Sequence, residues 1–276
     1  MTAIESAPAS ARWRPAPLLK VSAVVHAACA VAFGLYPASW PWILLVLAAN
    51  HSIIITSVFL PRGQLLGPNL VRLPAAAARR GEVALTFDDG PDPLVTPQVL
   101  DLLDLYDMKA SFFCVGRKVR AHPDVVQDIV RRGHAVENHS FQHIPWFAIV
   151  DPWRMSRDIE TAQATIARVA GERPRFFRAP NGFRNPWLDA LLARRGLRYV
   201  SWTHRGLDTL RRDAAVVTRA LTRDLAAGDV LLLHDGNCAR TANDQPMVLA
   251  VLPVLLERLR SLGLKSVALR TALPPH

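Results

Sequence analysis

The stretch VALTFDDGP, residues 83–91, contains the features on which both the fold and the chemistry depend. Its first part, VALTF (83–87), is short, apolar and rich in strand-forming residues, and so predicts a buried β-strand. Two carboxylates, Asp88 and Asp89, follow at once, and they repel each other unless a positive charge lies nearby. Because turns favour Asp, Gly and Pro, the segment taken alone is equally consistent with a simple turn.

Beyond this strand, short β-rich runs alternate with helical patterns up to the C-terminus. Further strands are predicted at residues 110–115, 134–138, 175–179, 197–202, 229–234 and 265–270. Helices are predicted between them at residues 96–106, 122–132, 151–170, 185–195, near 213–226 and near 246–261. About seven such units predict an α/β domain with parallel strands and crossover helices. We expect a barrel, because an open doubly wound sheet would have a glycine-rich phosphate loop after the first strand, and GPDP is not one.

Polar side chains stand at or just beyond the ends of five predicted strands. They are Asp88, Asp89, His139, Arg178, His204, Asp208 and His234. In a parallel barrel the carboxyl ends of all strands meet at one rim, where active sites form. The convergence of these residues predicts a functional site at that rim.

The pair His139 and His143 in NHSFQH indicates a metal site when it is combined with the two carboxylates. A spacing of four lets both imidazoles face one point, on a helical turn or in a tight loop. Two histidines and one carboxylate leave a coordination position free for water on Zn²⁺ or a similar ion. One Asp could then bind the ion while its neighbour accepts a proton. Taken alone, an H-x-x-x-H pair is more often structural.

Three further residues could support such chemistry. His234 could donate a proton to a leaving group, although a histidine that closes an apolar strand is more often structural. Asp208 could fix the tautomer of His234 and raise its pKa. Arg178 could steady the free carboxylate and lower its pKa, although Arg178 and Asp208 could equally form ordinary ion pairs.

Four motifs now make the sequence recognisable: TFDDGP (86–91), HSFQH (139–143), RAPNG (178–182) and LLH (232–234). In this order they resemble the polysaccharide deacetylase family, the family-4 carbohydrate esterases with a NodB-homology domain. The resemblance covers roughly residues 82–270. It implies a distorted (β/α) barrel that uses a divalent metal to remove N-acetyl, sometimes O-acetyl, groups from sugars.

The resemblance also implies a role for each matching residue. Asp88 is the expected general base and His234 the general acid, with Arg178 and Asp208 supporting them. The expected ligands of the metal, most simply Zn²⁺ but alternatively Co²⁺, Ni²⁺ or Mn²⁺, are Asp89, His139 and His143. The expected oxyanion donor is the backbone N–H of Asn181, and the expected substrate contacts are Leu232, Pro180 and Gly182.

The sequence departs from the family pattern at several positions. Asn181 stands where an aromatic residue is common, Thr209 replaces a tryptophan, and Ile144 replaces a proline. The residues His204 and Arg205 are also unusual. We therefore expect a complete catalytic centre with altered sugar-binding walls, and a substrate that is not standard for the family.

Before this domain, residues 18–60 contain two apolar stretches of spanning length, joined by PASWP (37–41) with Trp40 and Trp42 as interfacial anchors. They predict a membrane hairpin after a tail at 1–17 and before a connector at 61–81, with the deacetylase domain at 82–276. Two competing interpretations are a signal peptide and helices that lie in the interface, because polar residues occur mid-segment at 50–52.

Charges suggest where the enzyme works. Positive residues flank both ends of the hairpin, so the positive-inside rule predicts a bacterial inner-membrane protein with its domain in the cytoplasm. The net charge of +10 favours anionic lipids or a phosphorylated substrate, and no basic tract indicates nucleic-acid binding. Three scattered cysteines exclude a disulfide framework.

The expected substrate is accordingly a lipid-linked N-acetylhexosamine, on undecaprenyl phosphate or a lipid A precursor. Its phosphate could be contacted by Arg184, Arg205, Arg211 and Arg212. A domain on the outer side would instead favour peptidoglycan or an exported polysaccharide. The chain could also be a catalytically idle sugar-binding relative or a metal-dependent phosphodiesterase, although a phosphodiesterase usually needs ligands for two metals.

Overall fold

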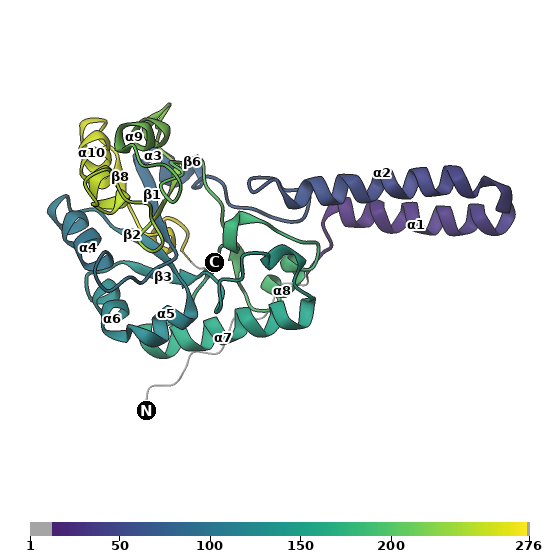
Figure 1. Cartoon of the computed structure of the whole chain (residues 1–276), viewed down its shortest axis with the longest axis horizontal. Coiled ribbons are helices and arrows are strands. Elements are labelled where there is room, and N and C mark those ends of the chain that lie inside the picture. The colour runs from purple at the N-terminus through teal and green to yellow at the C-terminus, as the bar shows by residue number, and fades with distance from the viewer. Residues whose placement is uncertain (1–12, 275–276) are drawn as a thin grey trace.

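A computed structural model describes residues 13–274, so most of the tail predicted at 1–17 lies outside the described residues. Figure 1 shows two parts, a long helical hairpin and an α/β domain from whose side the hairpin projects. The hairpin consists of α1 (Pro17–Leu35) and α2 (Trp40–Val58), joined by the short 3₁₀ helix η1 (Pro37–Ser39). Each of the two long helices has 19 residues and a proline in its first turn, where the missing N–H costs nothing.

The hairpin exposes its apolar side chains and encloses some of its polar ones. Both helices are long and apolar enough to cross a bilayer, and α1 lies near the N-terminus, where a signal sequence would also lie. Between the helices, the Asn50 amide donates to the Ser22 hydroxyl at 2.9 Å, and both residues are buried. The rings of His26 and His51 pack edge to face, 5.2 Å apart. These polar residues therefore have partners within the hairpin.

The domain is built on one parallel sheet with the order β5-β4-β3-β2-β1-β7-β6, and β8 pairs with β1. The strands are β1 (Glu82–Asp88), β2 (Ala110–Cys114), β3 (Ala135–Asn138), β4 (Phe176–Phe177), β5 (Arg198–Tyr199), β6 (His204–Arg205), β7 (Val230–His234) and β8 (Lys265–Ser266). The sheet curls into an incomplete barrel that is open between β5 and β6. This confirms the predicted distorted barrel of about seven parallel strands.

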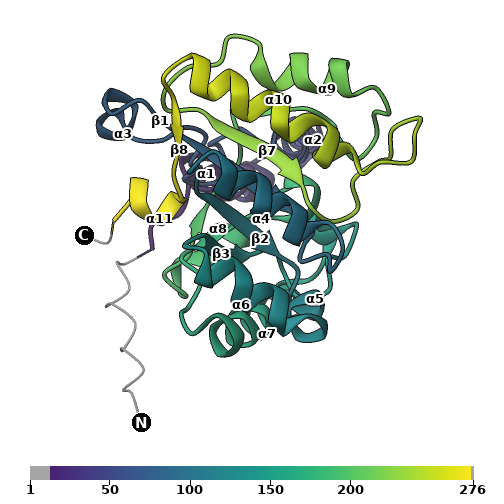
Figure 2. The same ribbon diagram turned by 90° about the vertical axis from the view of Figure 1, so that its left-hand side faces the viewer.

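Helices cover the outside of the curled sheet, as Figure 2 shows. They are α4 (Thr96–Leu105), α5 (Gly116–Ala121), α6 (Pro123–Arg131), α7 (Pro152–Ala170), α8 (Leu188–Ala193), α9 (Ala214–Thr222) and α10 (Met247–Ser261). The short helices α3 (Ala75–Arg79) and α11 (Leu269–Ala272) instead pack on the core inside the barrel. Two 3₁₀ turns, η2 (Phe147–Ile149) and η3 (Pro180–Gly182), lie in the loops.

The alternation of side chains along β1 explains where its polar end points. Val83, Leu85 and Phe87 belong to the core between sheet and helices, whereas Ala84 belongs to the core inside the barrel. Because successive side chains in a strand face opposite sides, Thr86 and Asp88 share the inner face with Ala84. The carboxylate of Asp88 therefore lies inside the mouth of the barrel.

Several segments differ from the sequence-based expectation. The strand predicted at 265–270 stops at Ser266, and α11 follows, because Leu269, Ala272 and Leu273 share one helical face that closes the inner core. The strands predicted at 175–179 and 197–202 are ladders of two residues each. The sequence reading missed α3, α5 and β6, which are all short. In the connector, residues 70–73 hydrogen-bond to Tyr199, Ser201 and Gly228, and so help to fill the opening of the barrel.

Candidate active site

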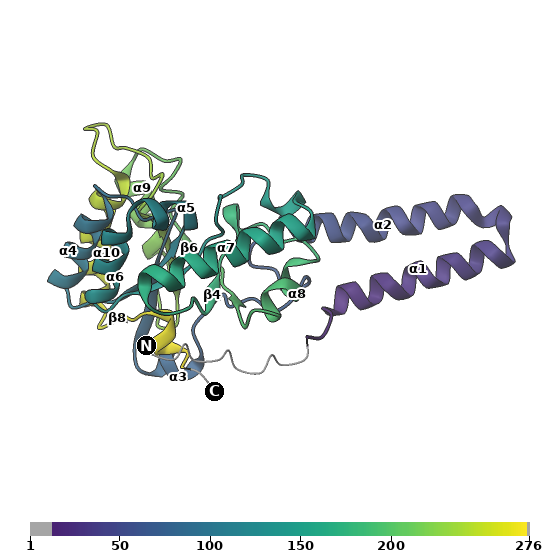
Figure 3. The same ribbon diagram turned by 90° about the horizontal axis from the view of Figure 1, so that it is seen from below.

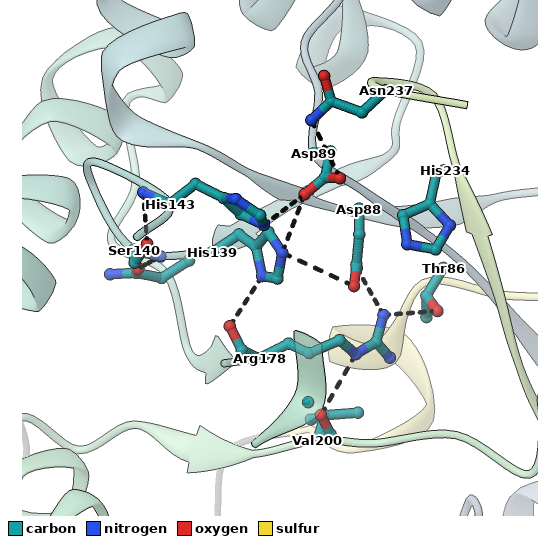
Figure 4. Close-up of polar contacts among 12 residues, drawn as sticks. Thr86, Asp88, Asp89, His139, Ser140, His143, Arg178, Val200, His234 and Asn237 are labelled. Atoms are coloured by element: carbon teal, nitrogen blue, oxygen red, sulfur yellow. Dashed lines mark hydrogen bonds and ion pairs between the residues drawn. The ribbon is translucent and has the colours of Figure 1, made fainter. Parts of the chain in front are cut away.

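The rim of the barrel brings together residues from loops that are far apart in the sequence, as Figure 4 shows. Asp88 ends β1 and Asp89 follows it, while His139 comes directly after β3 and His234 ends β7. Arg178 follows β4 directly. The structure therefore brings these five residues together at the rim, as the sequence predicted.

Three potential metal ligands meet at one point. The Asp89 Oδ1 atom lies 3.2 Å from His139 Nε2 and 2.8 Å from His143 Nε2, and the three candidate ligand atoms all lie within 4.8 Å of one another. His139 Nδ1 lies 2.8 Å from the Arg178 carbonyl oxygen. Because a carbonyl only accepts, Nδ1 must hold the proton of the neutral ring, and the lone pair of Nε2 faces Asp89.

The Asp89 carboxylate is consistent with a cation at this point. Its Oδ1 is buried and has no hydrogen-bond partner among the described residues. Burial by itself would raise the pKa of Asp89, but its contacts with the imidazoles of His139 and His143, in their protonated form, outweigh burial and hold the pKa below its usual range. An ionised carboxylate oxygen and imidazole nitrogens that face it are the ligand atoms that a divalent metal such as Zn²⁺ binds.

The surrounding chain fixes these ligands in place. Asn237 Nδ2 donates to Asp89 Oδ2 at 3.2 Å, and Lys118 Nζ donates to the Asp89 carbonyl at 2.8 Å. His143 lies in a tight loop, not on a helix, and its N–H donates to Ser140 Oγ at 3.1 Å. The Asp158 carboxylate accepts two further backbone N–H groups of that loop. Asp89, Ser140 and His143 all have positive φ, a cost that is typical of functional sites.

The second carboxylate, Asp88, is held by a buried arginine. Arg178 is fully buried, and its Nη1 donates to Asp88 Oδ1 at 2.7 Å and to Thr86 Oγ1 at 2.9 Å. Its other nitrogens donate to the carbonyls of Val200 and Ser201. Because all of these hydrogen bonds hold one buried guanidinium, its position and its positive charge beside Asp88 are fixed. Asp88 Oδ2 lies 3.9 Å from His139 Nε2, so this oxygen stands beside the metal ligands.

On the opposite wall, His234 is paired with Asp208. Its Nδ1 lies 2.8 Å from Asp208 Oδ1, and its backbone N–H donates to Asp208 Oδ2 at 2.8 Å. Burial by itself would lower the pKa of His234, but the charge of Asp208 and its hydrogen bond outweigh burial and raise that pKa. His234 is thereby kept protonated to higher pH, as a general acid requires.

A pocket opens above these groups. It is lined by Asp88, Asp89, His139, His143, Asn181, Gly182, Trp202, Arg205, Thr209, Leu232, His234 and Asn237. Gly182 has a φ of 77°, and a Cβ atom there would lie 2.5 Å from the Trp202 ring, so only glycine fits. The predicted contacts Asn181, Gly182 and Leu232 line the pocket.

Some predicted residues lie elsewhere. Pro180 is buried and does not line the pocket. His204 contacts Asp229 at 3.2 Å, at the start of β7, and so lies away from the rim. Arg184 is buried and donates to the carbonyls of Leu66 and Gly63, so it serves the connector and not the pocket.

Sequence reasoning did not assign a role to Asn237 or Trp202. Asn237 lies three residues beyond the end of β7, and Trp202 follows β5. Their positions, Trp202 at the end of the strand predicted at 197–202 and Asn237 just after the one predicted at 229–234, were a signal that could have identified both, because the ends of parallel strands and the loops after them form the rim.

Comparisons with known proteins agree with this geometry. Residues 75–200 match the family model described as polysaccharide deacetylase. The chain is 32% identical over 187 residues to a peptidoglycan-N-acetylglucosamine deacetylase of Bacillus cereus, a match that covers 67% of this chain and 84% of that protein. It is 35% identical over 200 residues to a chitooligosaccharide deacetylase of Rhizobium leguminosarum bv. trifolii, covering 65% of this chain and 89% of that one.

The fold is similar to that of a solved relative. The crystal structure of the Bc1960 peptidoglycan N-acetylglucosamine deacetylase superposes with a TM-score of 0.67 at 26% identity, covering 75% of this chain and 94% of that chain. Motifs, fold and relatives thus agree, and the chain belongs to the polysaccharide deacetylase family of divalent-metal-dependent amide hydrolases, as an amino-sugar N-deacetylase.

Proposed function

We propose that this enzyme removes N-acetyl groups from N-acetylglucosamine residues of a glycan, of the peptidoglycan or chitooligosaccharide type. The observation that carries this proposal is the cluster of Asp89, His139 and His143 beside the separately held Asp88 and His234. The relatives named for these two substrates support the choice of glycan. Zn²⁺ is the proposed metal, because one carboxylate and two imidazoles suit it and leave a coordination position open.

The residues around the pocket divide the chemistry among them. A bound cation would polarise the acetyl carbonyl and lower the pKa of water. Asp88 takes a proton from the attacking water, since Arg178 fixes one of its oxygens and leaves the other facing the ligands. The N–H of Asn181 donates to the carbonyl oxygen as charge develops there. His234, protonated and oriented by Asp208, gives its proton to the departing amine.

The experiment that tests this function is release of free amines from N-acetylglucosamine oligomers and from purified peptidoglycan. The expected result is loss of acetyl groups by mass spectrometry, abolished by a chelator and restored by Zn²⁺. A metal-replete protein that binds these glycans without deacetylating them would identify a catalytically idle relative. Cleavage of phosphodiesters by the same preparation would favour a phosphodiesterase.

A second candidate substrate is an anionic, lipid-linked amino sugar, and Arg205 is the observation that favours it. Arg205 lines the pocket, its guanidinium lies 5.4 Å from the centre of the Trp202 ring, and its buried Nε has no hydrogen-bond partner among the described residues. A guanidinium without such a partner, beside a metal site, suits a phosphate. A hexosamine on undecaprenyl phosphate or a lipid A precursor has that group.

The hairpin is proposed to anchor the enzyme in the bacterial inner membrane. The positive charges at both ends of the hairpin favour a domain on the cytoplasmic side, where a lipid-linked amino sugar would be within reach, whereas an external domain would favour peptidoglycan. A topology reporter at the C-terminus separates these cases. A cytoplasmic reporter supports the lipid-linked substrate, and an external reporter supports the glycan polymer.

A further inference from the structure

Six of the seven tryptophans are more than a third exposed, and they occur at two levels of the molecule. Trp40 and Trp42 lie at the tip of the hairpin. The other four belong to the side of the domain from which the hairpin projects. They are Trp13, Trp146, Trp153 and Trp187, and all but Trp13 are at least 57% exposed. Exposed tryptophan is costly in water but favoured at the surface of a bilayer.

The domain tryptophans lie on elements that pack together beside the hairpin. Residues from η2, the first half of α7 and α8 share one hydrophobic cluster, whereas Ile166 in the second half of α7 belongs to the other core. Figures 1 and 3 both place α8 and one end of α7 next to the hairpin. The chain just before α1 also reaches α8, since Trp13 Nε1 donates to Asp189 Oδ2 at 2.7 Å.

We call the exposed residues of these elements the base surface: Trp146, Ile149, Trp153 and Trp187, which are 66%, 82%, 85% and 57% exposed. Arginines lie at its edges, with Arg14 before α1, Arg62 after α2 and Arg154 on α7, all of them at least partly exposed. Aromatic side chains among basic ones match an anionic headgroup layer, because the rings partition into the interface and the charges attract the lipid.

The distance between the two tryptophan levels fits a bilayer. A helix of 19 residues is about 28 Å long, close to the roughly 30 Å of hydrocarbon in a membrane. With Trp40 and Trp42 at one interface, the base surface falls at the other. The rings are thus spaced as the aromatic belts of membrane proteins are.

The base of the hairpin is also fixed to the wall of the active site. The Phe59 and Phe183 rings pack edge to face at 5.3 Å, and the Arg184 N–H donates to the Val58 carbonyl at 3.4 Å. Arg62 Nη1 donates to the Thr203 carbonyl at 3.2 Å. Phe183 directly follows the pocket residues Asn181 and Gly182. The orientation of the hairpin is thereby coupled to the segment that lines the pocket.

We propose that the base surface contacts the lipid headgroups and holds the mouth of the active site at the membrane surface. This inference rests on the proposed anchoring role of the hairpin. It restricts the substrate to amino sugars that come within reach of the bilayer, whether they belong to a glycan or to a lipid. The partner of the surface is an anionic bilayer.

Fluorescent labels at single cysteines test this inference in the full-length protein reconstituted into phosphatidylcholine–phosphatidylglycerol vesicles. In a Cys238→Ser background, nitrobenzoxadiazole is attached at Trp153→Cys or, as a second position, Ile149→Cys. Leu105→Cys is the matched control, because Leu105 is 76% exposed and ends α4, at the far side of the domain. Leu45→Cys in α2 reports insertion of the hairpin, and the unsubstituted background measures labelling of Cys29 and Cys114.

We expect the labels at 149 and 153 to be blue-shifted and quenched by headgroup-proximal nitroxide lipids, and the label at 105 to be unaffected. The label at 45 should respond to nitroxides deep in the acyl chains. If the label at position 45 is quenched while the labels at 149 and 153 behave like the label at 105, the hairpin inserts but the proposed contact between the base surface and the lipid headgroups is rejected. If the label at position 45 is not quenched either, the hairpin does not insert. The proposed membrane anchor is then rejected, and with it the contact of the base surface. Amine release from soluble oligomers, assayed on the same preparations, reports separately on the proposed activity.

Discussion

The rim of the barrel and the middle of the hairpin both bury polar side chains, but the hydrogen bonds of these side chains are satisfied differently. In the hairpin, Asn50 bonds to Ser22, and the two histidine rings pack against each other. At the rim, Asp89 Oδ1 and Arg205 Nε are buried without hydrogen-bond partners among the described residues. Since unpartnered buried groups are costly, a ligand that completes Asp89 Oδ1 and Arg205 Nε would stabilise the rim. Arg184 Nε is also buried without a partner but lies outside the pocket, so such a group is a candidate for binding only where it lines the pocket.

The largest effect is expected from removal of a metal ligand. Asp89→Ala should lose bound metal and all measurable deacetylation, because the two imidazoles alone do not neutralise or enclose the ion. Plasma mass spectrometry measures the bound metal, and release of free amines measures deacetylation. The surface substitution Asp107→Asn serves as the control. Full metal content in Asp89→Ala would show that Oδ1 is not a ligand and would remove the contrast with the hairpin.

The general base can be tested with the metal in place. Asp88→Asn should keep its bound metal but lower turnover by about 10²–10⁴-fold, since an amide cannot accept the proton from water. Turnover and metal content must be measured on the same sample. Wild-type turnover in a metal-replete Asp88→Asn protein would contradict the assigned role.

The pH profile tests the pair of His234 and Asp208. His234 is the proposed proton donor, so activity should fall as pH rises through its pKa, which Asp208 raises. Asp208→Asn lowers that pKa and should move the alkaline limb of kcat/KM to lower pH, with a loss of about 10–100-fold at the optimum. An alkaline limb that does not move would assign it to another group.

Arg205 supplies the second unpartnered group at the rim, and a charged substrate tests whether it binds an anion. We compare the KM of the neutral N-acetylglucosamine trimer with that of its 1-phosphate. The wild-type enzyme should prefer the phosphate, and Arg205→Gln should reduce the preference by about tenfold to a hundredfold, the value of a charged hydrogen bond. Arg205→Lys should keep part of it. Equal KM values in the wild type would reject the anionic substrate.

The smallest effect is expected in the hairpin. A double-mutant cycle of Asn50→Ala and Ser22→Ala should give a coupling of about 0.6 kcal/mol, typical of hydrogen bonds between membrane helices. Unfolding in detergent micelles measures it, and deacetylation of soluble oligomers should not change. A large loss of activity would show that the hairpin shapes the pocket as well as the anchor.

Much of the site could be predicted from local sequence because each rim residue follows a strand with a clear pattern. Asp88 and His234 end runs of buried β-formers, so their placement needed only the rule that parallel strands end together. The short ladders β4 and β5, with two residues each, were overestimated, because their apolar runs continue into the core without pairing. His204 was misplaced because β6 has only two residues, and no pattern distinguishes its start from its end.

The sequence alone predicted the alternation of the longer strands and helices, the two apolar helices and the candidate catalytic side chains. These depend on periodicity, chain length and residue type, which are properties of short segments. Only the tertiary structure decided that His204 and Arg184 lie outside the pocket, that Asn237 holds Asp89, and that the hairpin base is fixed to the pocket wall. Contacts between residues far apart in the chain depend on how the elements pack, and no local pattern records that packing.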